Sequence, residues 1–292
     1  MDKLLRGVCF NNKIAFSFLK TTDTVNEAIR IHNLAPPPAA ALGRALTATA
    51  FMASGLKNAT DALSVTIRGN GACGHIVTAA NSNLELRGMI DNPTARLAPN
   101  EKGKLDVGGV VGIGFMNVIK DLGLKEPYVG QTVLQTGEIG DDLTYYFATS
   151  EQVPSSVGLG VLMEKDNTVK QAGGFIIQLM PFAEESVIAK LEENLSKVAS
   201  VTSMLDAGNT PEQMLEIVLE GFDLEITDCM DTQFVCDCSK SKVEKALIAI
   251  GKKELKEMIE DDKEIEVNCH FCSKHYVFNV EELKTLYRKA TR

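Results

Sequence analysis

No part of this chain approaches the roughly 20 consecutive apolar residues that a membrane-spanning helix needs. Residues 1–6 also lack the basic start and apolar run of a signal peptide. We therefore expect no membrane association and a cytoplasmic location. Because cytoplasmic thiols are kept reduced, the seven cysteines should bind a metal, sense oxidants or pack in a core rather than form permanent disulfides.

The chain also lacks a convincing phosphate-binding loop. Residues 108–114 are rich in glycine, but the order of the glycines matches neither phosphate-binding fingerprint, and no Lys-Ser or Lys-Thr follows. The stretch therefore carries little weight as a nucleotide site.

Basic residues are scarce in one region only. The net charge is −9, and residues 180–230 account for all of it, with eleven acidic side chains against Lys190 and Lys197. Residues 1–179 and 231–292 are each neutral. A solvated acidic helical face is the commoner meaning of such a run, and a detachable interdomain segment is the functional alternative. This distribution predicts a core domain over 1–179, an acidic helical linker over 180–230 and a C-terminal domain over 231–292.

Four cysteines of that C-terminal segment form two short pairs. Cys236 and Cys238 make a C-x-C, and Cys269 and Cys272 make a C-x-x-C thirty residues later. Two such pairs can each supply half of a tetrahedral four-sulfur zinc site. The same sulfurs can also form two disulfides, so the site can double as a redox sensor. The other cysteines, Cys9, Cys73 and Cys229, are expected to be small buried apolar residues, although Cys229 lies close enough to the cluster to join it under oxidation.

Short β-rich runs separated by turns predict an antiparallel sheet, and one Ala-rich run predicts a buried helix. Strands with helices grouped beside them indicate the α+β class. The predicted strands cover residues 63–68, 75–79, 84–90, 132–136, 143–149, 157–163 and 174–179, and the predicted helix covers 39–56.

The acidic segment itself predicts two amphipathic helices. The first follows Pro181, and the second begins at Thr210, which can cap it in a capping-box-like spacing with Gln213. Each helix carries an apolar stripe that must be buried, so these helices can dock on a neighbouring domain and expose a binding surface when undocked. The stripes are Val187, Leu191 and Leu195 on the first helix and Met214, Leu215 and Val218 on the second.

Three further blocks, together with the cysteine spacing, resemble the redox-regulated heat shock protein 33 family, the 33 kDa chaperonin. Their order and spacing extend the resemblance over nearly the whole chain, and Ser156 is a minor departure where alanine is expected. The blocks are Thr136-Gly137-Glu138-Ile139, Ser150-Glu151-Gln152-Val153-Pro154-Ser155-Ser156-Val157 and Ala172-Gly173-Gly174-Phe175-Ile176-Ile177-Gln178-Leu179-Met180-Pro181.

The resemblance implies an α+β N-terminal domain, a helical linker and a small C-terminal zinc domain. It also implies an ATP-independent holdase that binds unfolding proteins without turnover, and a homodimer in the active state. We therefore expect one Zn²⁺ on the four clustered thiolates in the reduced state. Oxidation to disulfides, with Cys269 joined to Cys272 and Cys236 to Cys238, would release the metal and free the linker helices. The two apolar stripes are then the hypothetical client-binding surface.

Two other functions compete with this interpretation. A zinc ribbon that binds nucleic acid normally has a basic face, whereas residues 231–292 are neutral and the isoelectric point is about 5.1. A thiol-disulfide oxidoreductase normally places its C-x-x-C at the start of a helix in a βαβ setting, whereas Cys272 is followed by a strand-like run. Both alternatives therefore rank below the redox-regulated holdase. We expect neither nucleic-acid binding nor enzymatic turnover.

Overall fold

The structure is a computed structural model that describes residues 2–198 and 200–290. The chain divides after Val235 into two compact units, called unit 1 and unit 2. The α+β class is confirmed, because a large sheet, several helices and the clustered cysteines are all present. The sequence-based boundaries at 179/180 and 230/231 stay a prediction.

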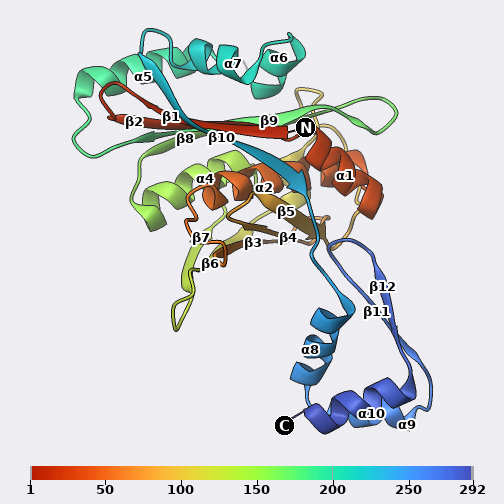
Figure 1. The fold of residues 1–292 in the computed structure, drawn as a ribbon. Coiled ribbons are helices and arrows are strands. Elements are labelled where there is room, and N and C mark those ends of the chain that lie inside the picture. Colours follow the sequence, from red (N-terminus) through yellow and green to blue (C-terminus); the bar gives the residue numbers. More distant parts are fainter. Residues whose placement is uncertain (1, 199, 291–292) are drawn as a thin grey trace. The chain divides into compact units, whose positions relative to one another are not determined.

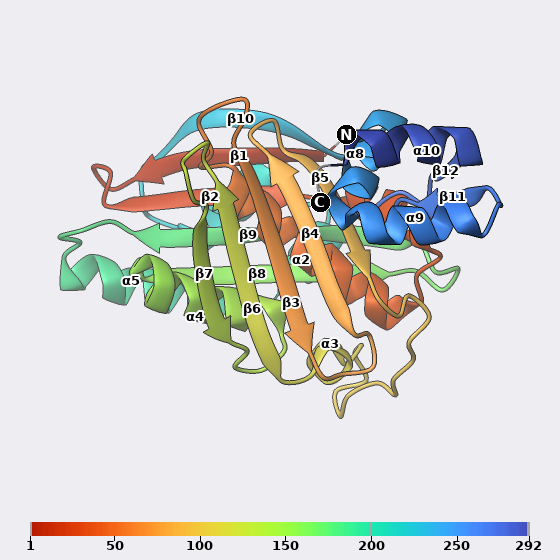
Figure 2. The same cartoon turned by 90° about the horizontal axis from the view of Figure 1, so that it is seen from below.

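Unit 1 is built on one ten-stranded sheet with the order β7-β6-β3-β4-β5-β10-β1-β2-β9-β8. Its strand pairs are antiparallel except for a short parallel pair of β10 with β5, which joins Gln233 and Phe234 to Glu85 and Leu86. Figure 2 shows β7, β6, β3 and β4 in front of β1, β2 and β9, which run at a steep angle behind them. The strands are β1 (Asp2–Cys9), β2 (Ile14–Lys20), β3 (Ala62–Gly69), β4 (His75–Asn81), β5 (Glu85–Ile90), β6 (Gly114–Asp121), β7 (Tyr128–Val133), β8 (Ser155–Met163), β9 (Val169–Leu179) and β10 (Leu224–Phe234).

Several helices fill the space between the two halves of this sheet (Figure 1). The central one, α2, is rich in alanine, so it can approach strands on both sides, and nearly all its side chains are buried. No helix of residues 2–198 and 200–290 combines the length and apolar character needed to cross a bilayer. The helices that precede β8 in the chain are α1 (Thr22–His32), α2 (Pro36–Ala53), α3 (Val107–Val111), α4 (Ile139–Tyr146) and the π-helix η1 (Phe147–Glu151).

Three more helices cover the outer face of the half formed by β1, β2, β8 and β9 (Figure 1). They are α5 (Glu185–Lys197), α6 (Val201–Asp206) and α7 (Pro211–Val218). The predicted capping box is confirmed, because the Thr210 side chain accepts from the Gln213 N–H and the Gln213 side chain accepts from the Thr210 N–H. A second apolar core lies between these helices and the sheet.

Two predicted strands differ from the structure. Of residues 132–136, only 132 and 133 belong to a strand, β7, and the rest lie in the turn before α4. The strand predicted over 143–149 is wrong. Residues 143–149 are rich in β-branched and aromatic side chains, but they belong to α4 and η1. Asp141 and Asp142 lie in the first turn of α4, where carboxylates favour the positive end of a helix dipole. Asp142 also accepts hydrogen bonds from the N–H groups of Gln135 and Thr136, which fixes the turn before the helix.

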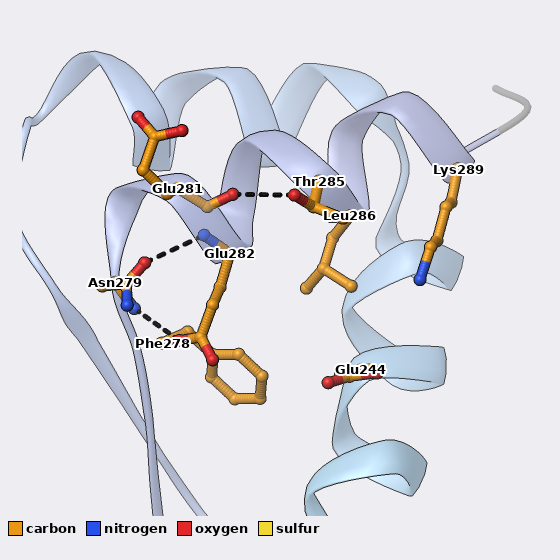
Figure 3. Close-up of a pocket in the computed structure, with 8 residues that line it drawn as sticks. All are labelled: Glu244, Phe278, Asn279, Glu281, Glu282, Thr285, Leu286 and Lys289. Atoms are coloured by element: carbon orange, nitrogen blue, oxygen red, sulfur yellow. Dashed lines mark hydrogen bonds between the residues drawn. The ribbon is translucent and has the colours of Figure 1, made fainter.

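Unit 2 consists of three helices and a two-stranded hairpin around a small core. Helix α10 starts with a capping box between Asn279 and Glu282, which lies beside a cavity of about 300 Å³ (Figure 3). Phe278 is fully buried in the core, together with Leu255 and Leu283. The elements are α8 (Lys240–Ile250), α9 (Lys252–Glu260), β11 (Ile265–Asn268), β12 (His275–Phe278) and α10 (Val280–Lys289).

Candidate metal centre

Two chain turns of unit 2 bring the four predicted cysteines together. Cys236 and Cys238 lie just before α8, whose N-cap is Ser239. Cys269 and Cys272 lie in the turn of the β11–β12 hairpin, where the Cys269 N–H donates to the carbonyl of Lys274. The C-x-x-C therefore sits in a hairpin turn and not at the start of a helix. This setting differs from the one expected for a thiol-disulfide oxidoreductase.

The four sulfur atoms lie within 4.8 Å of one another. The Sγ atoms of Cys236 and Cys269 are 3.6 Å apart, and those of Cys238 and Cys272 are 3.3 Å apart. Sulfurs at about 2.3 Å from a tetrahedral Zn²⁺ are separated by about 3.8 Å, whereas a disulfide needs about 2.05 Å. The arrangement therefore fits a metal-binding set of four thiolates. Such a set suits Zn²⁺ or iron with sulfur ligands.

Three thiols of the cluster, those of Cys236, Cys238 and Cys272, do not ionise alike. Burial raises the pKa of Cys236 and that of Cys272. Burial also acts to raise the pKa of Cys238, but the hydrogen bond from the Tyr276 hydroxyl and the contacts with the other three cysteines outweigh it and lower that pKa to about 7. The Tyr276 oxygen lies 3.0 Å from the sulfur of Cys238. Of Cys236, Cys238 and Cys272, Cys238 is therefore the thiol that ionises most readily near neutral pH.

Tyr276 is a site residue that the sequence analysis did not identify. It lies on β12 four residues after Cys272, within the strand-like run that follows the C-x-x-C. The available signal was the proximity of a hydroxyl-bearing residue to the cysteine pair, but nothing in the pattern indicates toward which sulfur it points. His270 lies between Cys269 and Cys272 in the sequence. Its side chain is exposed, and it is not part of the metal-ligating cluster found among the described residues.

The remaining cysteines behave differently from one another. Cys9 and Cys73 are buried as predicted, and burial raises the pKa of each thiol to about 11. Cys229 is exposed, so the prediction of burial is wrong for this residue. It lies on β10, most of whose side chains are exposed or only half-buried. The local sequence does not reveal this exposure, because it depends on what covers the strand.

The predicted client-binding stripes lie in the second core of unit 1. All but one of their side chains are buried there, and Leu195 is partly buried against the same core. They share that core with Phe16 of β2 and Phe175 of β9. Two polar contacts reinforce the packing, because Lys190 Nζ donates to the carbonyl of Gly221 and Asn194 Nδ2 to that of Glu220. In this structure the stripes therefore serve as packing surfaces.

Comparison with known proteins extends over the whole chain. The sequence profile described as "Hsp33 protein" matches residues 2–279. A 33 kDa chaperonin of Lachnoclostridium phytofermentans is 53% identical over 289 residues, which cover 99% of both chains. A 33 kDa chaperonin of Clostridium botulinum strain Hall is 47% identical, over 97% of this chain and 96% of the other. These names describe a chaperone and not an enzyme.

The fold is also similar to a solved structure. The crystal structure of a 33 kDa chaperonin, a heat shock protein 33 homologue from Thermotoga maritima, superposes with a TM-score of 0.89. The two chains are 36% identical, and the match covers 98% of each.

Proposed function

This chain belongs to the Hsp33 protein family, and on that premise we propose that it is a redox-regulated holdase. It binds unfolding proteins and prevents their aggregation under oxidative stress, without ATP and in the cytoplasm. The observation that carries the proposal is the cluster of four cysteine sulfurs within 4.8 Å in unit 2. The proposal has three steps, which concern the metal, the oxidation and the client surface.

In the reduced state the four cysteines hold one Zn²⁺. When bound, zinc keeps its sulfur ligands deprotonated and contributes folding free energy to the unit. Unit 2 needs that contribution, because its core is small and most of its side chains are at least partly exposed. The Tyr276 hydroxyl donates to Cys238 and orients that ligand from outside the cluster.

Oxidation removes the thiolates on which the metal depends. A thiolate attacks peroxide to give a sulfenic acid and hydroxide, and a second thiol then displaces water to form the disulfide. Formation of each disulfide thus transfers two electrons from two sulfurs to one peroxide molecule, which is reduced to two water molecules. The pairing Cys236–Cys238 and Cys269–Cys272 follows the sequence spacing, although the sulfurs of Cys236 and Cys269 are 3.6 Å apart and those of Cys238 and Cys272 are 3.3 Å apart. The pairing is therefore part of the proposal.

The client surface consists of the stripes on α5 and α7 and the sheet face that they cover. Undocking these helices would expose their buried side chains together with Phe16 and Phe175. Large exposed apolar areas bind other proteins. The acidic faces of the helices would help to keep a client complex in solution, and the active form associates into a homodimer.

Chain connectivity supports a link between the oxidised cysteines and the helices. Strand β10 follows α7 after a short turn and leads directly to Cys236. Its last backbone bond to β5 runs from the Val235 N–H to the Leu86 carbonyl at 2.7 Å. Because β10 pairs with β5 over only two residues, unfolding of unit 2 would fray this end first. Fraying of β10 would then loosen the connection that anchors α7.

Light scattering from a heat-denaturing client tests the proposal. The zinc-loaded reduced protein should not suppress aggregation, and the same protein treated with peroxide and mild warming should suppress it. A dithiol should reverse the effect. The variant Cys269→Ser with Cys272→Ser should lose redox control, and Cys229→Ser is the matched control because that exposed cysteine lies outside the cluster. Equal suppression by the reduced and oxidised forms would contradict the switch.

A further inference from the structure

Unit 1 contains a cavity that the chaperone proposal does not use. Its volume is about 350 Å³, and its walls come from β1, β2, β6, β9, the end of α2 and η1. We call it the Arg6 cavity after the cation in its wall. Phe51 and Ile176 supply apolar surface to the wall and are both buried. A volume of this size is within the range of sites that bind small molecules.

Positively charged side chains outnumber negatively charged ones around the Arg6 cavity. Two cations, Arg6 and Lys120, line it together with one carboxylate, Glu151. Lys120 Nζ lies 2.6 Å from Glu151 Oε1, which also accepts from the Tyr146 hydroxyl at 2.8 Å. Lys120 is therefore already compensated by Glu151.

Arg6 has no such partner. Its guanidinium donates to the backbone carbonyl of Ser54, and within residues 2–198 and 200–290 no carboxylate forms an ion pair with it. The side chain is half-buried on β1. A half-buried cation without a counter-ion attracts an anion, and a guanidinium binds a carboxylate through two parallel hydrogen bonds.

Two backbone irregularities meet at the same cavity. The register of β1 with β10 shifts between Arg6 and Gly7, which leaves Thr227 without a partner residue in the strand ladder. Thr227 also lines the cavity. A side chain at Gly7 would lie 2.2 Å from the carbonyl of Glu225 and 2.4 Å from Phe16, so this close strand approach requires glycine. The opposite wall includes Phe147 and Glu151 of the π-helix η1. β-bulges and π-helices are both over-represented at functional sites.

We propose that the Arg6 cavity binds a small amphipathic carboxylate. The carboxylate would lie on the Arg6 guanidinium, and the hydrocarbon part would lie along Phe51 and Ile176. One uncompensated positive charge in the wall matches the single negative charge of a carboxylate. The site is separate from the four-cysteine cluster, because all its lining residues belong to unit 1.

Titration calorimetry on the full-length, reduced, zinc-loaded protein tests the proposal with octanoate as the probe. We expect saturable binding with one site per chain. Octan-1-ol and octylamine share the hydrocarbon tail but lack the carboxylate, so each should bind at least tenfold more weakly. Arg6→Gln should weaken octanoate binding about tenfold or more, as expected for loss of one charge-assisted pair. Arg6→Lys keeps the positive charge but lacks the planar guanidinium that donates two parallel hydrogen bonds. It should therefore cause an intermediate loss of affinity for octanoate.

Arg68→Gln is the matched control, because Arg68 is an exposed arginine on β3 that does not line the cavity. It should bind octanoate as the unchanged protein does. If Arg6→Gln does not fold, as judged by circular dichroism, Ala15→Leu decides instead, because it fills part of the cavity without changing a charge. Equal losses in Arg6→Gln and Arg68→Gln, undiminished binding in Ala15→Leu, or equal affinities for octanoate and octan-1-ol would each overturn the proposal.

Discussion

Leu4, Leu19 and Leu34 in unit 1 are completely excluded from solvent, and so are Leu255, Phe278 and Leu283 in unit 2. The difference lies in what surrounds them. In unit 1 such residues belong to a continuous core between the two sheet halves, and a second core lies under α5–α7. In unit 2 the core contains few fully buried side chains, and the cysteine cluster lies beside it. Burial alone can stabilise the first unit, whereas the second needs an additional cross-link.

The strongest test of this contrast is removal of the Zn²⁺ that we propose for the four cysteines. A chelator should unfold unit 2 and leave the central core of unit 1 folded, because structural Zn²⁺ contributes about 10–16 kcal/mol to small zinc-dependent folds. Amide hydrogen exchange should show loss of protection in α8–α10 while α2 remains protected. Retained protection in α10 after complete metal removal would show that the unit 2 core suffices by itself.

The second test compares two side chains of α7. Leu215 is buried in the second core, so Leu215→Ala should destabilise the docked helices by about 2–5 kcal/mol. This change should raise holdase activity of the reduced protein. Ile217 on the same helix is 45% exposed, and Ile217→Ala should cost well under about 1 kcal/mol. Urea unfolding measures both costs, and equal costs would contradict the assignment of the buried face.

The third test uses alkaline pH within unit 1. Burial raises the pKa of Cys9 and that of Cys73 to about 11, from a reference value of 9.0. Between these values the unfolded chain releases the thiol protons while the folded chain keeps them, so stability falls as pH rises from about 9 to about 11. Each thiol should account for up to about 2–3 kcal/mol of this loss. Chemical unfolding of Cys73→Ala over this pH range should show a flatter decline in stability than that of the unchanged protein.

The smallest expected effect concerns the hydroxyl next to the metal centre. Tyr276→Phe removes the hydrogen bond to Cys238 and should weaken metal binding about tenfold, or about 1.4 kcal/mol. Competition with a chromophoric chelator measures the affinity. Tyr287→Phe changes another tyrosine of unit 2 whose ring packs near Lys252, and it should leave the affinity unchanged. Comparable losses in both variants would point to general destabilisation of the unit.

Local patterns in the sequence predicted the features that depend on neighbouring residues. The α+β class, the capping box at Thr210 and the proximity of the four cysteines are all present in the structure. Features that depend on a particular side-chain contact or on tertiary packing were missed. The side chains of residues 143–149 suit a strand, but the turn fixed by Asp142 starts a helix there. The exposure of Cys229 and the direction of the Tyr276 hydroxyl also depend on tertiary packing that no local pattern encodes.

The pairing of β1 with β10 has a consequence for synthesis on the ribosome. Asp2 lies opposite Thr232, so β1 lacks one of its two neighbours until the end of β10 has been translated. At 5–20 residues per second the wait is roughly 10–45 s. During that time the edge of β1 is open to pairing with other nascent chains, which is a hazard for any unpaired strand. Cys236 and Cys238 follow the end of β10 within a few residues. The first cysteine pair is therefore made directly after the strand that completes the sheet.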